Sequence, residues 1–258
     1  MSYEELEKRL VDPIRPKGFP IGIKLLRHED EITEYVVTRP REKIALCQLL
    51  GQARLRGKTV GATAEDIDAC VFGTRILGMK EMPEDIADGS RWSELADLDP
   101  EVMRNLLEES HMFKLGEYSG IVTAPLRMFD ALEADPDLIM VFGNPAQIWA
   151  LTVAYHDVTG KRLKVDFCGH AACEAIVATA ETGEPWVTIP CGGARGLSAV
   201  ESDELLMTFS VDQLKKMLER VEKARIRYPA GGVYGVLTTS PVEEEYVTKM
   251  ISRKPKDS

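Results

Sequence analysis

The sequence predicts an α/β or α+β fold in which a mixed sheet is flanked by helices. Helix-like and strand-like patterns alternate along the chain, and no internal repeat or low-complexity tract interrupts them. Hydrophobic residues make up 44% of the 258 positions, enough for a substantial core. We expect a single compact domain over residues 1–258, with a helical N-terminal portion in which residues 79–115 could form a helical lobe, and a frayed tail at 252–258.

The first half of the chain is predicted to be largely helical. Leu6 and Leu10 recur among charged residues ahead of Pro13, which is typical of a short amphipathic helix. Segment 41–56 repeats apolar residues at three-residue steps and includes Cys47 on the apolar face. The elements expected here are helices at 3–11 and 41–56, strands at 21–26 and 60–63, a mixed segment at 66–77 and short helices between 79 and 112.

The second half alternates more regularly between strands and helices. Buried-strand patterns occur at 120–125 and 137–143, and Asn144 followed by Pro145 is typical of a helix cap and first turn. The alanine-rich segment 170–179 predicts a helix that packs closely. The other elements expected are a helix at 146–156, strands at 162–167, 186–189 and 204–209, and an amphipathic helix at 212–224.

Charge and hydropathy argue against several classes of protein. Forty-two acidic and 32 basic residues give a net charge of −10, so the mean field repels nucleic-acid backbones and anionic lipids. The apolar runs end long before the roughly 20 residues that a membrane-spanning helix needs. The charged segment Met1–Leu10 does not resemble an export signal, and the five cysteines are an odd number. We expect a cytoplasmic protein without a disulfide framework.

Cysteines are the most informative residues. Cys168, Cys173 and Cys191 are close in the sequence and lie beside expected element ends, whereas Cys47 and Cys70 could join them only through folding. Thiolates suit soft metals and iron–sulfur clusters, and several ligands can converge where elements end. The pattern therefore indicates an iron–sulfur cluster or another metal as a cofactor.

Two plainer interpretations of the cysteines stay open. Cys47 and Cys173 lie on apolar helical faces, where an unligated cysteine usually acts as a small buried hydrophobe. Cys191 lies in a predicted turn between Pro190 and a glycine pair, which makes it the candidate catalytic nucleophile if the chain is an enzyme.

A glycine-rich segment offers a different kind of site. Gly192, Gly193 and Arg195 could bind an anion through exposed backbone amides and a guanidinium, with Asn144 as a further candidate ligand. The segment matches neither a P-loop nor a dinucleotide fingerprint. A tight turn with a solvated arginine is the alternative. His170, between two cysteines, is a candidate base or ligand.

Several spaced motifs occur together in this chain. They are Ile23-Lys24 on an early strand, Cys47 in a helix after Arg39-Pro40-Arg41, Cys70 followed by Gly73, Gly143-Asn144-Pro145-Ala146-Gln147 after a buried strand, the Cys173 helix, and Ile189-Pro190-Cys191-Gly192-Gly193-Ala194-Arg195. From about residue 20 to residue 222, the chain resembles the domain of unknown function 169 family (DUF169).

The resemblance implies a prokaryotic cytoplasmic protein, from a family that is largely anaerobic and archaeal, with no settled activity to carry over. It also implies a shared thiolate site, because family members similarly carry cysteines at the positions of Cys47, Cys70, Cys173 and Cys191. This chain departs from the family pattern in two places. Val71-Phe72-Gly73 follows Cys70 in place of a Pro-Gly pair, and Cys168 is an extra cysteine.

Three hypotheses follow. In the first, redox or sensing work with a redox partner depends on a metal or cluster held by Cys47, Cys70, Cys173 and Cys191, with Cys168 and His170 as spare ligands. In the second, a small-molecule binding protein or enzyme has a pocket for an anionic ligand at 143–147 and 191–196. In the third, the chain is a homo-oligomeric interaction module without chemistry.

Overall fold

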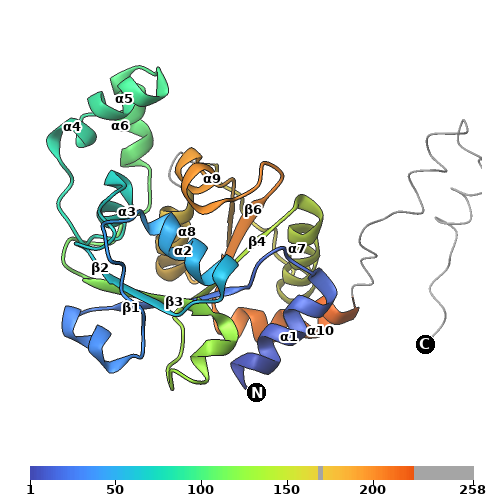
Figure 1. The fold of residues 1–258 in the computed structure, drawn as a ribbon. Coiled ribbons are helices and arrows are strands. Elements are labelled where there is room, and N and C mark those ends of the chain that lie inside the picture. The colour runs from blue at the N-terminus through green and yellow to red at the C-terminus, as the bar shows by residue number, and fades with distance from the viewer. Residues whose placement is uncertain (168–170, 224–258) are drawn as a thin grey trace, which may run out of the picture. The chain divides into compact units, whose positions relative to one another are not determined.

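The computed structural model describes residues 1–167 and 171–223, which build an α+β fold around a six-stranded sheet (Figure 1). The strand order is β2-β3-β1-β4-β6-β5, and every neighbouring pair is antiparallel. The strands are β1 (Ile21–Leu26), β2 (Val60–Thr63), β3 (Gly120–Pro125), β4 (Leu138–Gly143), β5 (Trp186–Thr188) and β6 (Leu205–Phe209).

Helices occupy most of the sequence between the strands. The α-helices are α1 (Tyr3–Ile14), α2 (Leu46–Arg56), α3 (Val71–Ile76), α4 (Glu84–Ala87), α5 (Ser90–Ala96), α6 (Pro100–Glu108), α7 (Pro145–Thr159), α8 (Ala171–Thr182), α9 (Gly192–Ser198) and α10 (Val211–Lys223). The 3-10 helices are η1 (Glu29–Glu34) and η2 (Leu126–Phe129).

Both faces of the sheet are covered by helices, and the alternation of side chains along β4 shows how. Leu138, Met140 and Phe142 belong to the core cluster shared with α2 and α8, whereas Ile139 and Val141 belong to the cluster shared with α1, α7 and α10. Figure 1 shows α2 and α8 on one side of the sheet and α1 and α10 on the other. Because both faces are buried, β4 is a continuous apolar run although its neighbours are antiparallel.

The sequence left open whether the fold is α/β or α+β, and the strand directions give α+β. Among the described residues, the parallel pairing that we expected in a mixed sheet is limited to two isolated bridges, Thr38 with Val60 and Val165 with Val187. The helices expected between 79 and 112 are present as α4, α5 and α6, which contact one another. The tail at 252–258 lies outside the described residues.

The strand predicted at 162–167 is wrong, since this segment forms only the single bridge at Val165. Its alternation of apolar and polar residues imitates a strand, yet Val165 and Phe167 are exposed. The neighbouring edge strand β5 has only three residues, so little backbone is left for pairing.

A buried ion pair fixes the end of α2 to the segment that precedes β6. Arg54 and Glu204 are 2% and 1% exposed, and the Arg54 guanidinium donates to the Glu204 carboxylate. The second carboxylate oxygen of Glu204 accepts the backbone N–H of Glu201 at 2.9 Å, and Arg54 also stacks over the Phe142 ring. A charge buried this deeply depends on its partner.

Candidate functional site

Four of the five cysteines lie at the starts of four helices that contact one another. Contacts join α2 with α3, α8 and α9, and α3 with α8. Cys47 is the second residue of α2, Cys70 immediately precedes α3, Cys173 is in the first turn of α8, and Cys191 immediately precedes α9. All four belong to, or pack against, the core cluster on one face of the sheet.

Backbone hydrogen bonds bring the starts of α2 and α3 together. The N–H of Ile44 donates to the Asp66 carbonyl at 2.8 Å, and the N–H of Ala69 donates to the Ile44 carbonyl at 3.2 Å. These bonds hold the segment before Cys70 against the segment before Cys47. Main-chain hydrogen bonds thus join the two segments that lead into the Cys47 and Cys70 helices.

Two glycine positions let α3 and α9 approach α2 closely. A methyl group at Gly73 would lie 3.1 Å from the Leu46 Cβ, and one at Gly51 would lie 3.0 Å from the Ser198 Cβ. Both distances are tighter than ordinary contacts between side chains. The absence of a side chain at these positions therefore permits α3 and α9 to pack closely against α2.

The ionisation of the Cys47 thiol depends on its neighbours. Cys47 is 7% exposed, and burial raises its pKa to about 12, with smaller contributions from the charges of Cys191 and Cys70. Burial disfavours the charged thiolate, and a second negative charge nearby disfavours it further. Cys47 is thus a protonated thiol at neutral pH, and the three sulfurs are near enough for their charges to interact.

The described side chains do not form a ready-made metal site. Among residues 1–167 and 171–223, no group of three or more histidine, cysteine or acidic side chains has the spacing to hold a metal ion. No disulfide joins any two of the four described cysteines. Cys168 and His170 lie outside the described residues. The ligand set Cys47, Cys70, Cys173 and Cys191 stays a prediction, as does the nucleophilic role of half-buried Cys191.

Asn144, predicted to bind an anionic ligand, is used by the fold itself. Its side chain accepts the backbone N–H groups of Ala146 at 3.1 Å and Gln147 at 2.9 Å, which caps α7. Gln147 returns the bond by accepting the Asn144 N–H, and its amide donates to the carbonyls of Ile14 and Arg15 at the end of α1. The Gly-Asn-Pro-Ala-Gln motif thus joins two helices.

The glycine-rich segment after Cys191 forms the start of α9. Arg195 donates through Nε to the Pro190 carbonyl at 3.1 Å and through a second nitrogen to the Glu201 carbonyl, which closes its own loop. Gly192 is exposed and Gly193 half-buried, with open space around Gly192. Ligand binding by this segment stays a prediction.

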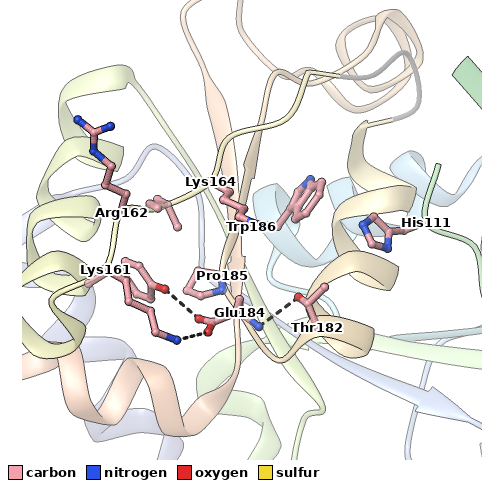
Figure 2. Close-up of a pocket in the computed structure, with 10 residues that line it drawn as sticks. His111, Lys161, Arg162, Lys164, Thr182, Glu184, Pro185 and Trp186 are labelled. Carbon is pink, nitrogen blue, oxygen red and sulfur yellow. Dashed lines mark hydrogen bonds and ion pairs between the residues drawn. The ribbon is translucent and has the colours of Figure 1, made fainter. Parts of the chain in front are cut away.

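One polar site was missed by sequence reasoning. Lys161, Arg162 and Lys164 line a cavity together with Glu184 and Trp186 (Figure 2). The available signal was the run of three cations within four positions. Its partners come from separate segments, so only the fold shows the cavity.

The described fold and its cysteines define an α+β protein in which four helix starts carry thiols. No helix in the part of the chain that the structure describes is long and apolar enough to cross a membrane. The model of the DUF169 family, described as Uncharacterised ArCR, matches residues 9–220, so the chain belongs to this family.

A curated relative matches most of this chain and most of its own length. Uncharacterized protein MJ0308 of Methanocaldococcus jannaschii is 28% identical over 214 residues, which cover 82% of this chain and 90% of that protein. No solved structure matches the chain significantly. The comparisons therefore show the family of this chain and name no activity for it.

Proposed function

We propose that the chain binds a soft metal ion or an iron–sulfur cluster through Cys47, Cys70, Cys173 and Cys191, and that it works in redox chemistry or sensing in the cytoplasm with a redox partner. The observation that carries this proposal is the placement of the four cysteines at the starts of packed helices, since α2 contacts α3, α8 and α9, and α3 contacts α8.

The donor chemistry supports a thiophilic ion. Sulfur ligands prefer zinc, copper(I) and iron–sulfur clusters over hard cations. Cys47 and Cys173 also lie in the first turns of α2 and α8. The N-terminal end of a helix favours negative charge, such as that of a thiolate. An iron–sulfur cluster bound there would supply one-electron transfer. Because the described side chains are not at coordination spacing, binding requires them to rotate toward one another.

Metal binding at this site must release protons. A thiol becomes a ligand only as the thiolate, and the Cys47 thiol, with a pKa of about 12, is protonated at neutral pH. The apparent affinity for a metal should therefore rise with pH, by about tenfold per pH unit for each proton released.

The test is anaerobic purification followed by reconstitution with ferrous iron and sulfide, and separately with Zn²⁺. Metal content, acid-labile sulfide and visible absorbance are measured on the folded chain. We expect stoichiometric metal in the unchanged chain and its loss in Cys70→Ser and Cys191→Ser, since these half-buried positions tolerate substitution better than the buried ones.

Cys168→Ser is the matched control, because it removes a cysteine outside the proposed ligand set. Metal binding should survive this change. A colourless chain without stoichiometric metal after reconstitution would count against the proposal, and so would equal loss of metal in the Cys168→Ser control.

The second candidate function, an anionic-ligand pocket at 143–147 and 191–196, draws support from the open space around exposed Gly192 at the start of α9. Thermal-shift measurements with carboxylates and nucleotides would test it. In that case Cys191 would be the single reactive thiol, and Arg195→Gln would remove the shift.

A further inference from the structure

A cavity of about 490 Å³ lies at the C-terminal end of α8, whereas Cys173 is in the first turn of that helix. Its walls come from the end of α7, the segment that follows α7, the end of α8, the start of β5 and His111 (Figure 2). The volume is within the range of small-molecule sites in proteins. None of the lining residues is a cysteine, so the cavity is separate from the proposed metal site.

Positive charge dominates the lining. Lys161, Arg162 and Lys164 are among the lining residues, which include a single acidic residue, Glu184. Lys161 is already neutralised, because its ammonium group is 2.9 Å from the Glu184 carboxylate. Arg162 and Lys164 are exposed and make no ion pair with any described residue. Neither cation is therefore within ion-pair distance of a described acidic side chain, although the charge of Lys164 contributes to lowering the pKa of Glu184.

This charge is unusual for the molecule. The chain carries a net charge of −10, so a local excess of positive charge runs against the general field. A cavity lined by one sign of charge concentrates ions of the opposite sign. The guanidinium of arginine also matches the geometry of carboxylate and phosphate oxygens.

The carboxylate of Glu184 is fixed in place. The hydroxyl group of Tyr155 donates to it at 2.9 Å, in addition to the Lys161 contact (Figure 2). The Lys161 hydrogen bond also lowers the pKa of Glu184, so the carboxylate stays ionised at neutral pH. Glu184 therefore holds Lys161 on one side of the cavity and leaves Arg162 and Lys164 to meet an anion.

An aromatic wall completes the cavity. Trp186 is 9% exposed and packs edge-on against the His111 ring, with the ring centroids 5.1 Å apart. Pro185 lies beside it in the lining. The indole N–H of Trp186 is buried and has no acceptor among the described residues. The wall thus offers apolar area, while its indole N–H is enclosed behind that surface.

We propose that this cavity binds a small aromatic anion, with its carboxylate or phosphate group at Arg162 and Lys164 and its planar body against Trp186 and Pro185. The lining favours both the anionic group and the planar body of such a ligand. A bare inorganic anion would leave the apolar wall uncovered, and a neutral aromatic compound would leave Arg162 and Lys164 without an anionic partner. The proposal goes beyond the metal site and does not depend on it.

The test uses 1-naphthoate and 1-naphthyl phosphate as probes, with 1-naphthamide as the neutral match and inorganic phosphate as the anion without a ring. Binding to the full chain is measured by saturation-transfer NMR and calorimetry. We expect at least one of the two aromatic anions to bind at least tenfold more tightly than naphthamide and inorganic phosphate. The two arms show whether carboxylate or phosphate is preferred.

The double variant Arg162→Gln/Lys164→Gln should weaken binding of the preferred anion by about 10- to 100-fold, because it removes two charge-assisted contacts. The matched control, Lys8→Gln/Lys215→Gln, removes the same charge from exposed positions on α1 and α10 and should leave binding unchanged. Equal binding of naphthamide, equal weakening in the control, or no binding of either aromatic anion would overturn the proposal.

Discussion

The two ends of α8 belong to regions of opposite construction. Its first turn carries Cys173, buried in the hydrophobic core cluster, and its last residue, Thr182, lines a cavity together with exposed cations. Around the cysteines, backbone hydrogen bonds and close packing hold the helices together, and a buried ion pair fixes the far end of α2. Around the cavity, Arg162 and Lys164 are exposed, and only Glu184 is held, by Tyr155 and Lys161. Substitutions should therefore change stability in the first region and ligand binding in the second.

The largest effect is expected at the buried ion pair on the cysteine side of the sheet. Glu204→Gln leaves the Arg54 guanidinium buried without a counter-charge and should lower the free energy of unfolding by about 3–5 kcal/mol. Chemical denaturation measures this change.

Glu201→Gln is the control for that substitution, because Glu201 is exposed and forms its ion pair with Lys17 at the surface. Its cost should stay below about 1 kcal/mol. Equal costs at the two positions would show that the buried pair does not organise this region.

The next effect is a loss of stability in alkali that depends on Cys47. An ordinary cysteine thiol has a pKa of 9.0, whereas the folded chain raises the pKa of Cys47 to about 12, so between these values the folded state holds the proton more tightly than the unfolded state. Stability should fall as pH rises through this window. By pH 10.5, the loss should be about 2 kcal/mol greater in the unchanged chain than in Cys47→Ala. Parallel plots of the free energy of unfolding against pH for the two proteins would contradict the raised pKa of Cys47.

Thiol accessibility should separate the cysteines from one another. Cys70 and Cys191 are half-buried, whereas Cys47 is buried and protonated at neutral pH. Iodoacetamide should therefore modify Cys47 at least tenfold more slowly than the other two, since the thiolate is the reactive form. Peptide mass spectrometry gives the rates, and equal rates would place Cys47 in a more open setting than the structure does.

The smallest effect is expected at the cavity. Glu184→Gln removes an ion pair whose side chains are 64% and 46% exposed, so the cost in stability should be below about 1 kcal/mol. The folded state lowers the pKa of Glu184, so this contribution is present at neutral pH and is lost as the pH falls below the ordinary glutamate value. A cost above about 2 kcal/mol, beyond the range of exposed ion pairs, would show that the cavity wall is structural.

Much of the fold was predictable because local patterns determine it. The apolar run at 137–143 and the Asn144-Pro145 cap predicted β4 and the start of α7 to within one residue, whereas α7 continues to Thr159, three residues beyond the predicted end. The segment at 162–167 misled because its alternation is genuine while its neighbour β5 is too short to pair with it. Alternation of apolar and polar residues shows that a segment can form a strand, and a neighbouring strand long enough to pair with it decides whether the strand forms.

The sites were harder to predict because they depend on contacts between distant segments. Cysteine type and position suggested a thiol site, but nothing local indicates that Gly51 and Gly73 let α9 and α3 pack closely against α2. The cavity depends on Lys161, Glu184 and His111, which come from three separate parts of the chain. Neither arrangement has a sequence pattern of its own.

The most direct measurement asks whether the thiols meet. Phenylarsine oxide binds stably only where two thiols are close enough to bond one arsenic atom, and intact-mass spectrometry counts its adducts without requiring any metal. In a Cys168→Ser background we expect one adduct per folded chain, weakened when Cys47 or Cys191 is replaced by serine. No stable adduct, or an adduct that survives both the Cys47→Ser and the Cys191→Ser replacement unchanged, would contradict the convergence of these sulfurs.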